Sequence, residues 1–298
     1  MITDQQWANL VHIRAADPEA VYRAYANRMR RSSLLSDNGT LFLVAADHTA
    51  RGALGVPGDP TAMVDRRSLL DRLTVALANP AVDGVLGTPD VIEELLLLGC
   101  LDDKIAIGSM NRGGLAGADW EIDDRFTAYT AQSIVDYRLD GGKMLLRLVD
   151  DDPGTVPTLK ACADAVTDLA RHGVMAMVEP LPYRRENGKL TLLKDTQSLA
   201  RAVTIASALG VTSAYTWLKL PAPEEPDAVL NATTLPTVVL GGVPSARVED
   251  DIASWGRALR HQVVRGLVVG RALLYPPDGD VAGAVESAAK VLSEGVRR

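Results

Sequence analysis

Short apolar runs alternate with longer segments of helical periodicity along most of the chain. Strands are predicted at residues 41–46, 82–87, 104–108, 143–149, 174–179, 213–221, 235–242 and 266–270, and the first of them is a continuous apolar run, the pattern of a strand buried on both faces. Helices are predicted at 65–78, 90–98, 127–136, 155–172, 196–209, 247–260 and 281–294. Residues 4–31 are also expected to be helical, with Asp17 and Pro18 opening a second helix there. A polar loop is expected from Pro180 to Asp195.

Eight strands alternating with helices predict an α/β fold, a single (β/α)8 TIM barrel whose site lies at the carboxyl ends of the strands. We expect one domain, with N-terminal helices at 1–38 and the barrel at 39–298. A doubly wound sheet is the structural rival. It is disfavoured because no G-x-G-x-x-G motif follows the first strand.

Composition narrows the class of protein. A net charge of −7 argues against nucleic acid or a membrane surface as partner, because both attract basic patches. Cys100 and Cys162 match no metal-ligand spacing and form no disulfide framework, so a reducing cytoplasm is expected. Neither a signal peptide nor a run of about 20 apolar residues is present. We therefore expect a soluble protein that acts on a small molecule and forms a homo-oligomer.

Charged side chains fall on or just after the predicted strands. They are Asp47, Lys143, Arg147, Glu179 and Lys219. The strand period places Lys143 and Arg147 on one face, and two cations in a packed barrel need anionic neighbours, for which Asp47 and Glu179 are the candidates. A purely structural network of ion pairs is the alternative.

Lys219 is the candidate nucleophile. It lies in the strand at 213–221, two residues before Pro221. Desolvation lowers the pKa of a buried amine, and a neutral amine attacks a carbonyl to form a Schiff base. The alternative is a lysine just past the strand that reaches solvent, as most lysines do.

The last two strands end in glycine-rich loops where barrels commonly bind phosphate. Backbone N–H groups would hold the phosphate there, and an arginine would add a charge-assisted clamp. The candidate phosphate-binding residues are Leu240, Gly241, Gly242, Ser245, Gly270 and Arg271.

In collinear order, these motifs resemble the class I aldolases of the tagatose-1,6-bisphosphate aldolase type and, more distantly, the DhnA-type fructose-bisphosphate aldolases. The resemblance spans residues 41–271 and rests on the runs AADHTARGAL at 45–54, KMLLRLVD at 143–150, MVEPLPY at 177–183, YTWLKLP at 215–221, LGGVPS at 240–245 and GLVVGR at 266–271. It implies a retro-aldol lyase that needs no metal or cofactor. In that family's pattern Lys219 forms the Schiff base, Glu179 is the general acid/base, Lys143 is a positioning cation and Asp47 is a polar anchor.

Departures from the family pattern border the substrate. His48 and Arg51 stand where the family has a tighter Gln-Arg pair, and Pro180 follows the glutamate. His48, Arg51, Arg147 and Arg184 offer more cationic groups than one phosphate needs, so a second anion on the substrate is expected. The candidates are a ketohexose bisphosphate and the 2-deoxy-5-keto-6-phosphogluconate of inositol breakdown. The alternatives are another Schiff-base or phosphate-binding barrel enzyme, such as an acyl transferase or decarboxylase, and a non-catalytic sugar-phosphate sensor.

Overall fold

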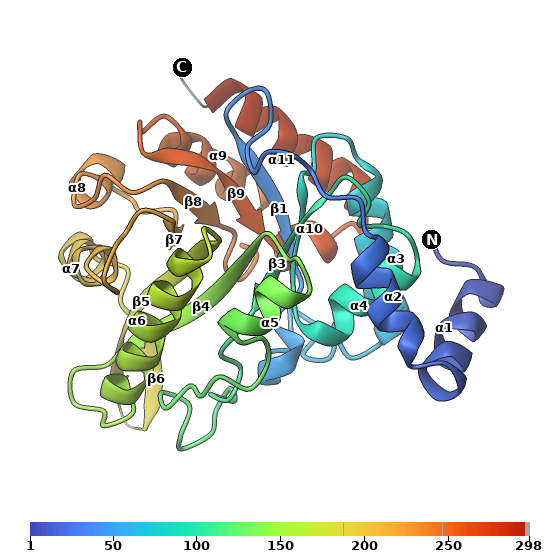
Figure 1. Cartoon of the computed structure of the whole chain (residues 1–298). Coiled ribbons are helices and arrows are strands. Elements are labelled where there is room, and N and C mark those ends of the chain that lie inside the picture. Colours follow the sequence, from blue (N-terminus) through green and yellow to red (C-terminus); the bar gives the residue numbers. More distant parts are fainter. Residues whose placement is uncertain (187, 246, 296–298) are drawn as a thin grey trace.

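Eight parallel strands close into a barrel surrounded by helices, as predicted (Figure 1). The computed structural model describes residues 1–186, 188–245 and 247–295, so the predicted end of the barrel at residue 298 lies outside the described residues. The barrel runs β1-β2-β3-β4-β5-β7-β8-β9, with parallel pairing of β4 to β5 and of β1 to β9 closing the ring. This arrangement is the (β/α)8 TIM barrel, preceded by a helical N-terminal segment.

The elements follow the predicted order. The strands are β1 Leu41–Ala45, β2 Gly84–Gly87, β3 Ile105–Ser109, β4 Gly141–Leu148, β5 Met175–Glu186, β6 Lys189–Leu192, β7 Thr216–Pro221, β8 Thr237–Leu240 and β9 Val264–Val269. The helices are α1 Asp4–Ala16, α2 Glu19–Asn27, a 3-10 turn at Thr49–Arg51, α3 Arg66–Ala78, α4 Pro89–Leu97, α5 Ala131–Asp136, α6 Thr155–Arg171, α7 Thr196–Ser207, α8 Pro226–Leu230, α9 Val248–Leu259, α10 Arg271–Leu274 and α11 Val281–Gly295. The short helices α8 and α10 were not predicted.

Two separate apolar clusters explain why the sequence of β1 is a continuous apolar run. In β1, Leu41 and Leu43 point into the barrel, where they pack with residues such as Met177 of β5. Phe42 and Val44 face outward into the larger cluster beneath the helices. Because successive side chains of a strand point to opposite faces, both faces of β1 are buried and both need apolar side chains.

The N-terminal segment packs against the amino-terminal end of the barrel. Arg28 forms a buried ion pair with Asp140, which directly precedes β4, at 3.0 Å. Arg31 pairs with Asp83 at 2.5 Å, just before β2. Leucines 34–35 pack against the cluster inside the barrel. This end is therefore filled by the segment between α2 and β1, and the opposite end holds the candidate site.

The segment after Pro180 corrects the sequence analysis. It was expected to be a polar loop, but β5 continues to Glu186 and pairs in antiparallel fashion with β6. Arg185 also forms an ion pair with Asp152 at 2.7 Å. Exposed and half-buried side chains alternate along the end of β5, as expected for a hairpin with one face toward solvent. The hairpin raises one wall above the carboxyl-terminal end of the barrel.

Candidate active site

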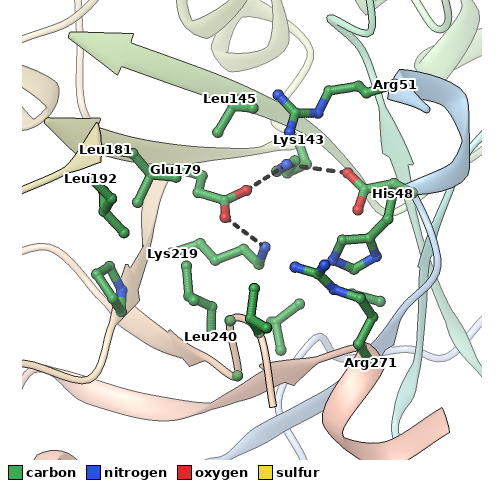
Figure 2. Close-up of a pocket in the computed structure, with 18 of the residues that line it drawn as sticks. His48, Arg51, Lys143, Leu145, Glu179, Leu181, Leu192, Lys219, Leu240 and Arg271 are labelled. Carbon is green, nitrogen blue, oxygen red and sulfur yellow. Dashed lines mark hydrogen bonds and ion pairs between the residues drawn. The ribbon is translucent and has the colours of Figure 1, made fainter. Parts of the chain in front are cut away.

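Four of the predicted residues form one continuous ion-pair chain across the carboxyl end of the barrel. Glu179 of β5 lies between two lysines: its Oε2 is 2.5 Å from Nζ of Lys143 on β4, and its Oε1 is 3.0 Å from Nζ of Lys219 on β7 (Figure 2). Lys143 also lies 3.1 Å from Oδ2 of Asp47, which follows β1. All four side chains are buried. The expected contacts of Lys143 with Asp47 and Glu179 are confirmed.

Asp47 is held by more partners than the sequence suggested. Ser109 Oγ donates to its Oδ2 at 2.9 Å, and Arg112 lies 3.0 Å from the same oxygen. Arg112 also donates to the backbone oxygens of Asn111 and Asp47. Sequence analysis missed Arg112, although a polar run directly after β3 was the available signal. The carboxylate of Asp47 is thus fixed between Lys143 and Arg112.

The charges in this chain shift one another's ionisation. Burial would raise the pKa of Asp47, but Lys143 and Arg112 hold it well below its usual range. Burial would likewise raise the pKa of Glu179, but Lys143 and Lys219 bring it to about 2. Burial lowers the pKa of Lys143 to about 8, although Asp47 and Glu179 act in the opposite direction. Both carboxylates are therefore ionised near pH 7, and Lys143 titrates close to neutrality.

These groups line a cavity of about 170 Å3 with two unlike sides. Figure 2 shows Leu181 and Leu192 of the hairpin on one side, His48 and Arg271 on the other, and the amine of Lys219 between them. The remaining lining residues are Ala45, Asp47, Arg51, Arg112, Lys143, Leu145, Glu179, Tyr183, Pro221, Leu240, Gly241, Gly242, Val243, Val268 and Gly270. Apolar side chains with a few convergent polar groups are the usual lining of a small-molecule site.

On the cationic side, some buried nitrogen atoms have no hydrogen-bond partner among the residues that the structure describes. They are Nη1 of Arg51, Nη2 of Arg112, Nε of Arg271 and Nδ1 of His48. Burial, assisted by Arg271 and opposed by Asp47, lowers the pKa of His48 to about 3, so its ring is neutral near pH 7. Unpaired buried donors are costly unless a ligand satisfies them. These atoms therefore mark a place for an anion.

The glycine-rich loops are partly as predicted. Leu240 ends β8 at the cavity wall and Gly241 and Gly242 follow it, while Gly270 and Arg271 follow β9. A Cβ on Gly270 would lie 2.5 Å from the backbone oxygen of Ala45, so only glycine fits there. Gly242 has a φ of 67°, in the left-handed region that favours glycine.

Three predicted binding residues lie outside this cavity lining. Ser245 donates its backbone N–H to Asp251 at 3.0 Å and its hydroxyl to the backbone oxygen of Arg247. Arg184 is exposed on the hairpin and pairs with Glu186 at 2.5 Å. Their placement is a correction to the sequence analysis.

Arg147 is the third predicted binding residue outside the cavity lining. The two-residue alternation of a strand predicted its face of β4 correctly, but the predicted partners were wrong. Its guanidinium reaches past the end of β4 into the loop between β3 and α5, where it pairs with Glu121 at 2.6 Å and Asp124 at 3.1 Å. It also donates to the backbone oxygen of Gly114. The expected contact with Asp47 or Glu179 was wrong. Arg147 instead anchors the loop that carries Arg112.

Comparison with known proteins assigns the chain to a family. A family model described as Cgl0159-like matches residues 39–289. The chain belongs to the Cgl0159-like family. The crystal structure of Cgl0159 from Corynebacterium glutamicum (Brevibacterium flavum) is similar over 99% of both chains, at 48% identity and a TM-score of 0.96. No curated protein matches this member of the Cgl0159-like family.

More distant solved structures share the fold of this Cgl0159-like chain. An archaeal fructose 1,6-bisphosphate aldolase matches at 17% identity and a TM-score of 0.69, over 92% of this chain and 100% of its own. Another archaeal fructose-1,6-bisphosphate aldolase, whose catalytic Lys is covalently bound to the carbinolamine intermediate of its substrate, matches at 16% identity and a TM-score of 0.63, over 91% of this chain and 99% of its own. At these identities the likeness concerns the fold alone. The resemblance to the tagatose type stays a prediction.

Three further features of the Cgl0159-like chain concern metal ligands, thiols and membrane-spanning helices. Within the described residues, no group of three His, Cys, Asp or Glu side chains is placed to bind a metal ion. Burial raises the pKa values of the free thiols Cys100 and Cys162. No helix in residues 1–186, 188–245 and 247–295 is long and apolar enough to cross a membrane.

Proposed function

We propose that the protein is a class I aldolase that cleaves a phosphorylated ketose or keto-sugar acid through a Schiff base on Lys219. The observation that carries the proposal is the position of the Glu179 carboxylate between two buried amines, at the carboxyl end of a barrel and beside a cavity. Schiff-base chemistry needs a nucleophilic amine and a nearby group that moves protons. The distant likeness to fructose-bisphosphate aldolases agrees with this chemistry.

Lys219 is a better nucleophile than Lys143 on geometric grounds. Lys143 lies within ion-pair distance of two carboxylates, Asp47 and Glu179, which hold it as an ammonium. Among the described residues, Lys219 has only Glu179 as a carboxylate partner, and its amine faces the cavity between the leucine side and Arg271 (Figure 2). Attack by Lys219 therefore breaks one ion pair and leaves the contacts of Lys143 in place.

In this mechanism, the neutral amine of Lys219 adds to the ketone carbon, one proton is taken up from solvent and water leaves, which gives a protonated imine. Glu179 takes the proton of the β-hydroxyl while the α–β carbon bond breaks. The electron pair of that bond neutralises the imine to an enamine, and the β carbon leaves as an aldehyde. Protonation of the α carbon and addition of one water release dihydroxyacetone phosphate and restore the amine.

The ion pairs also explain how Glu179 accepts the hydroxyl proton during carbon–carbon bond cleavage. Its pKa is near 2 because two cations face it. Formation of the neutral enamine removes the positive charge on the Lys219 nitrogen, so one of those cations is lost as the hydroxyl proton arrives. The pKa of Glu179 rises at that step and falls again when the lysine is restored.

The phosphate would bind at the loops after β8 and β9, beside Gly241, Gly242, Gly270 and Arg271. Arg271 has a buried Nε without a partner, and its Nη1 donates to the backbone oxygen of Gly55 at 3.1 Å. Charge-assisted hydrogen bonds of this kind suit a phosphate group. The substrate types in view are a ketohexose bisphosphate and 2-deoxy-5-keto-6-phosphogluconate.

Borohydride trapping tests the proposal. Reduction in the presence of dihydroxyacetone phosphate should add the ligand to the peptide that contains Lys219, because borohydride reduces an imine to a stable amine. The variant Lys219→Arg keeps the charge and should trap nothing. Label on Lys143 would assign the Schiff base to the other amine. Binding of dihydroxyacetone phosphate without any trapped adduct would indicate a sensor instead of an aldolase.

A further inference from the structure

We propose that the cationic side of the cavity binds a carboxylate, so that the substrate is a phosphorylated keto-sugar acid whose aldehyde fragment carries a carboxylate and no hydroxyl next to the aldehyde. This inference rests on the proposed aldolase function and selects one substrate class within it. Three observations carry it: the charge balance of the cavity, the unpartnered guanidinium nitrogens, and the chemistry of the remaining wall.

The charge balance fits one phosphate and one carboxylate. Five cationic side chains line the cavity, namely Arg51, Arg112, Lys143, Lys219 and Arg271. Two carboxylates, Asp47 and Glu179, oppose them, and His48 is neutral because its pKa is about 3. The surplus is three positive charges. A phosphate monoester brings close to two negative charges at neutral pH and a carboxylate brings one, whereas two phosphates bring nearly four.

The free donors match a small planar anion. Arg112 has one nitrogen left, because its Nε and Nη1 are already bonded to Asn111 and Asp47. Arg51 contributes Nη1, which is buried and has no partner. One donor from each arginine satisfies the two oxygens of a carboxylate.

The rest of the cavity wall offers little to hydroxyl groups. Among the described lining residues there is no Ser, Thr, Asn or Gln, and Tyr183 is the sole hydroxyl-bearing side chain. The apolar part of the lining includes Leu145, Leu181 and Leu192. A hydroxyl placed there would lose its hydrogen bonds to water without replacement. The wall therefore favours methylene groups between the carboxylate and the reacting carbon.

The condensation direction gives a direct test, because the acceptor aldehyde can be varied while dihydroxyacetone phosphate is kept. The enamine carbon forms a bond to the aldehyde carbon, the aldehyde oxygen takes one proton, and water then releases the product from Lys219. We would compare 3-oxopropanoate, propanal and glyceraldehyde 3-phosphate as acceptors. The expected kcat/KM for 3-oxopropanoate is about 10- to 100-fold above that for propanal, the effect of one charge-assisted contact, and it also exceeds that for glyceraldehyde 3-phosphate.

The variant Arg51→Met removes the guanidinium, with its charge and all of its donors, and keeps an unbranched apolar side chain. It should lower kcat/KM for 3-oxopropanoate about 10-fold or more and leave the value for propanal nearly unchanged. Arg184→Met, which changes an exposed arginine of the hairpin outside this cavity lining, is the matched control and should alter neither.

The outcomes separate this inference from the proposed function. If borohydride traps dihydroxyacetone phosphate on Lys219 but glyceraldehyde 3-phosphate is the best acceptor, the aldolase stands and the carboxylate subsite is wrong. If Arg51→Met lowers the values for propanal and 3-oxopropanoate equally, Arg51 does not bind the carboxylate. If no imine is trapped at all, the failure belongs to the proposed function.

Discussion

Lys143 and Lys219 bind opposite oxygens of one carboxylate, that of Glu179, at 2.5 and 3.0 Å. A single buried carboxylate thus links the ammonium held by Asp47 to the amine that faces the cavity (Figure 2). Because each oxygen already has its cation, Glu179 cannot rotate away without breaking a buried ion pair. Because proton transfer by Glu179 and nucleophilic attack by Lys219 are assigned to different side chains, substitutions can test the two roles separately.

The substitution Glu179→Gln should lower kcat for cleavage about 100- to 10,000-fold, the usual contribution of a positioned acid or base. Imine trapping with dihydroxyacetone phosphate should persist, because the amine of Lys219 remains. Steady-state kinetics beside borohydride trapping measures both. Glu186→Gln, on the exposed hairpin, is the control and should change neither quantity. Equal loss of trapping and cleavage would mean that Glu179 acts mainly by holding the lysines.

Lys143 gives the activity an alkaline limit. Burial lowers its pKa to about 8, so its positive charge is present below that pH and is lost above it. We expect kcat/KM to fall as pH rises through about 8, because neutral Lys143 no longer stabilises Asp47 and Glu179. Lys143→Arg should move this limb to higher pH, since a guanidinium stays protonated.

The lowered pKa of Lys143 also predicts that the fall of kcat/KM above about pH 8 does not come from unfolding. The pKa of Lys143 is lower in the folded chain than the ordinary value of 10.5. Between about pH 8 and 10.5 the unfolded chain binds more protons at this residue, so its contribution to stability rises with pH. Thermal unfolding measured across this window should therefore show no loss assigned to Lys143. A parallel decline of activity and melting temperature, absent in Lys143→Arg, would contradict this explanation.

Sequence alone predicts the barrel because eight short, largely apolar strand segments alternate with segments of helical periodicity. Asp47, Glu179 and Lys219 could be placed for a related reason: charged side chains in or beside such runs must face one another at the site. The hairpin escaped prediction because its alternation covers only a few residues of β5, and Pro180 read as the end of that strand.

The wrong partners predicted for Arg147 and the failure to predict Arg112 share one physical cause. The strand period fixes the face on which Arg147 lies, but the partners of a long side chain depend on the loop that folds over the strand end. That loop brings Glu121 and Asp124 to Arg147. It also brings Arg112 to Asp47, which is 65 residues away in the chain. Contacts between separate loops leave no periodic signal in a sequence.

Arg271 provides a test of the phosphate site. Arg271→Ala should weaken binding of dihydroxyacetone phosphate about 10-fold or more, the effect of one charge-assisted hydrogen bond. Imine formation with unphosphorylated dihydroxyacetone should hardly change, because the clamp acts through the phosphate. Trapping titrations with both ligands give the comparison, and Arg265→Ala on β9, whose Nη1 donates to the backbone oxygen of Gln262, serves as control. A similar loss for both ligands would assign Arg271 a structural role.

The N-terminal segment should contribute stability without affecting the chemistry. Arg28 and Asp140 form an ion pair whose side chains are 1% and 2% exposed. Asp140 also accepts hydrogen bonds from Arg30 and from the backbone N–H of Ala106. Breaking such a pair leaves a buried guanidinium without its counter-charge. Asp140→Asn should therefore lower the free energy of unfolding by about 3–5 kcal/mol.

The matched control is Asp168→Asn, which removes an exposed partner of Arg171 on α6. Exposed pairs of this kind are worth at most about 1 kcal/mol, so urea unfolding should distinguish the two variants clearly. Both should keep the kcat/KM of the unmodified chain, because Asp140 lies before β4 while Lys143, Glu179 and Lys219 converge at the other end of the barrel. If Asp140→Asn instead lowers kcat/KM while unfolding at the same urea concentration, the N-terminal segment takes part in the reaction and not only in the packing of the barrel.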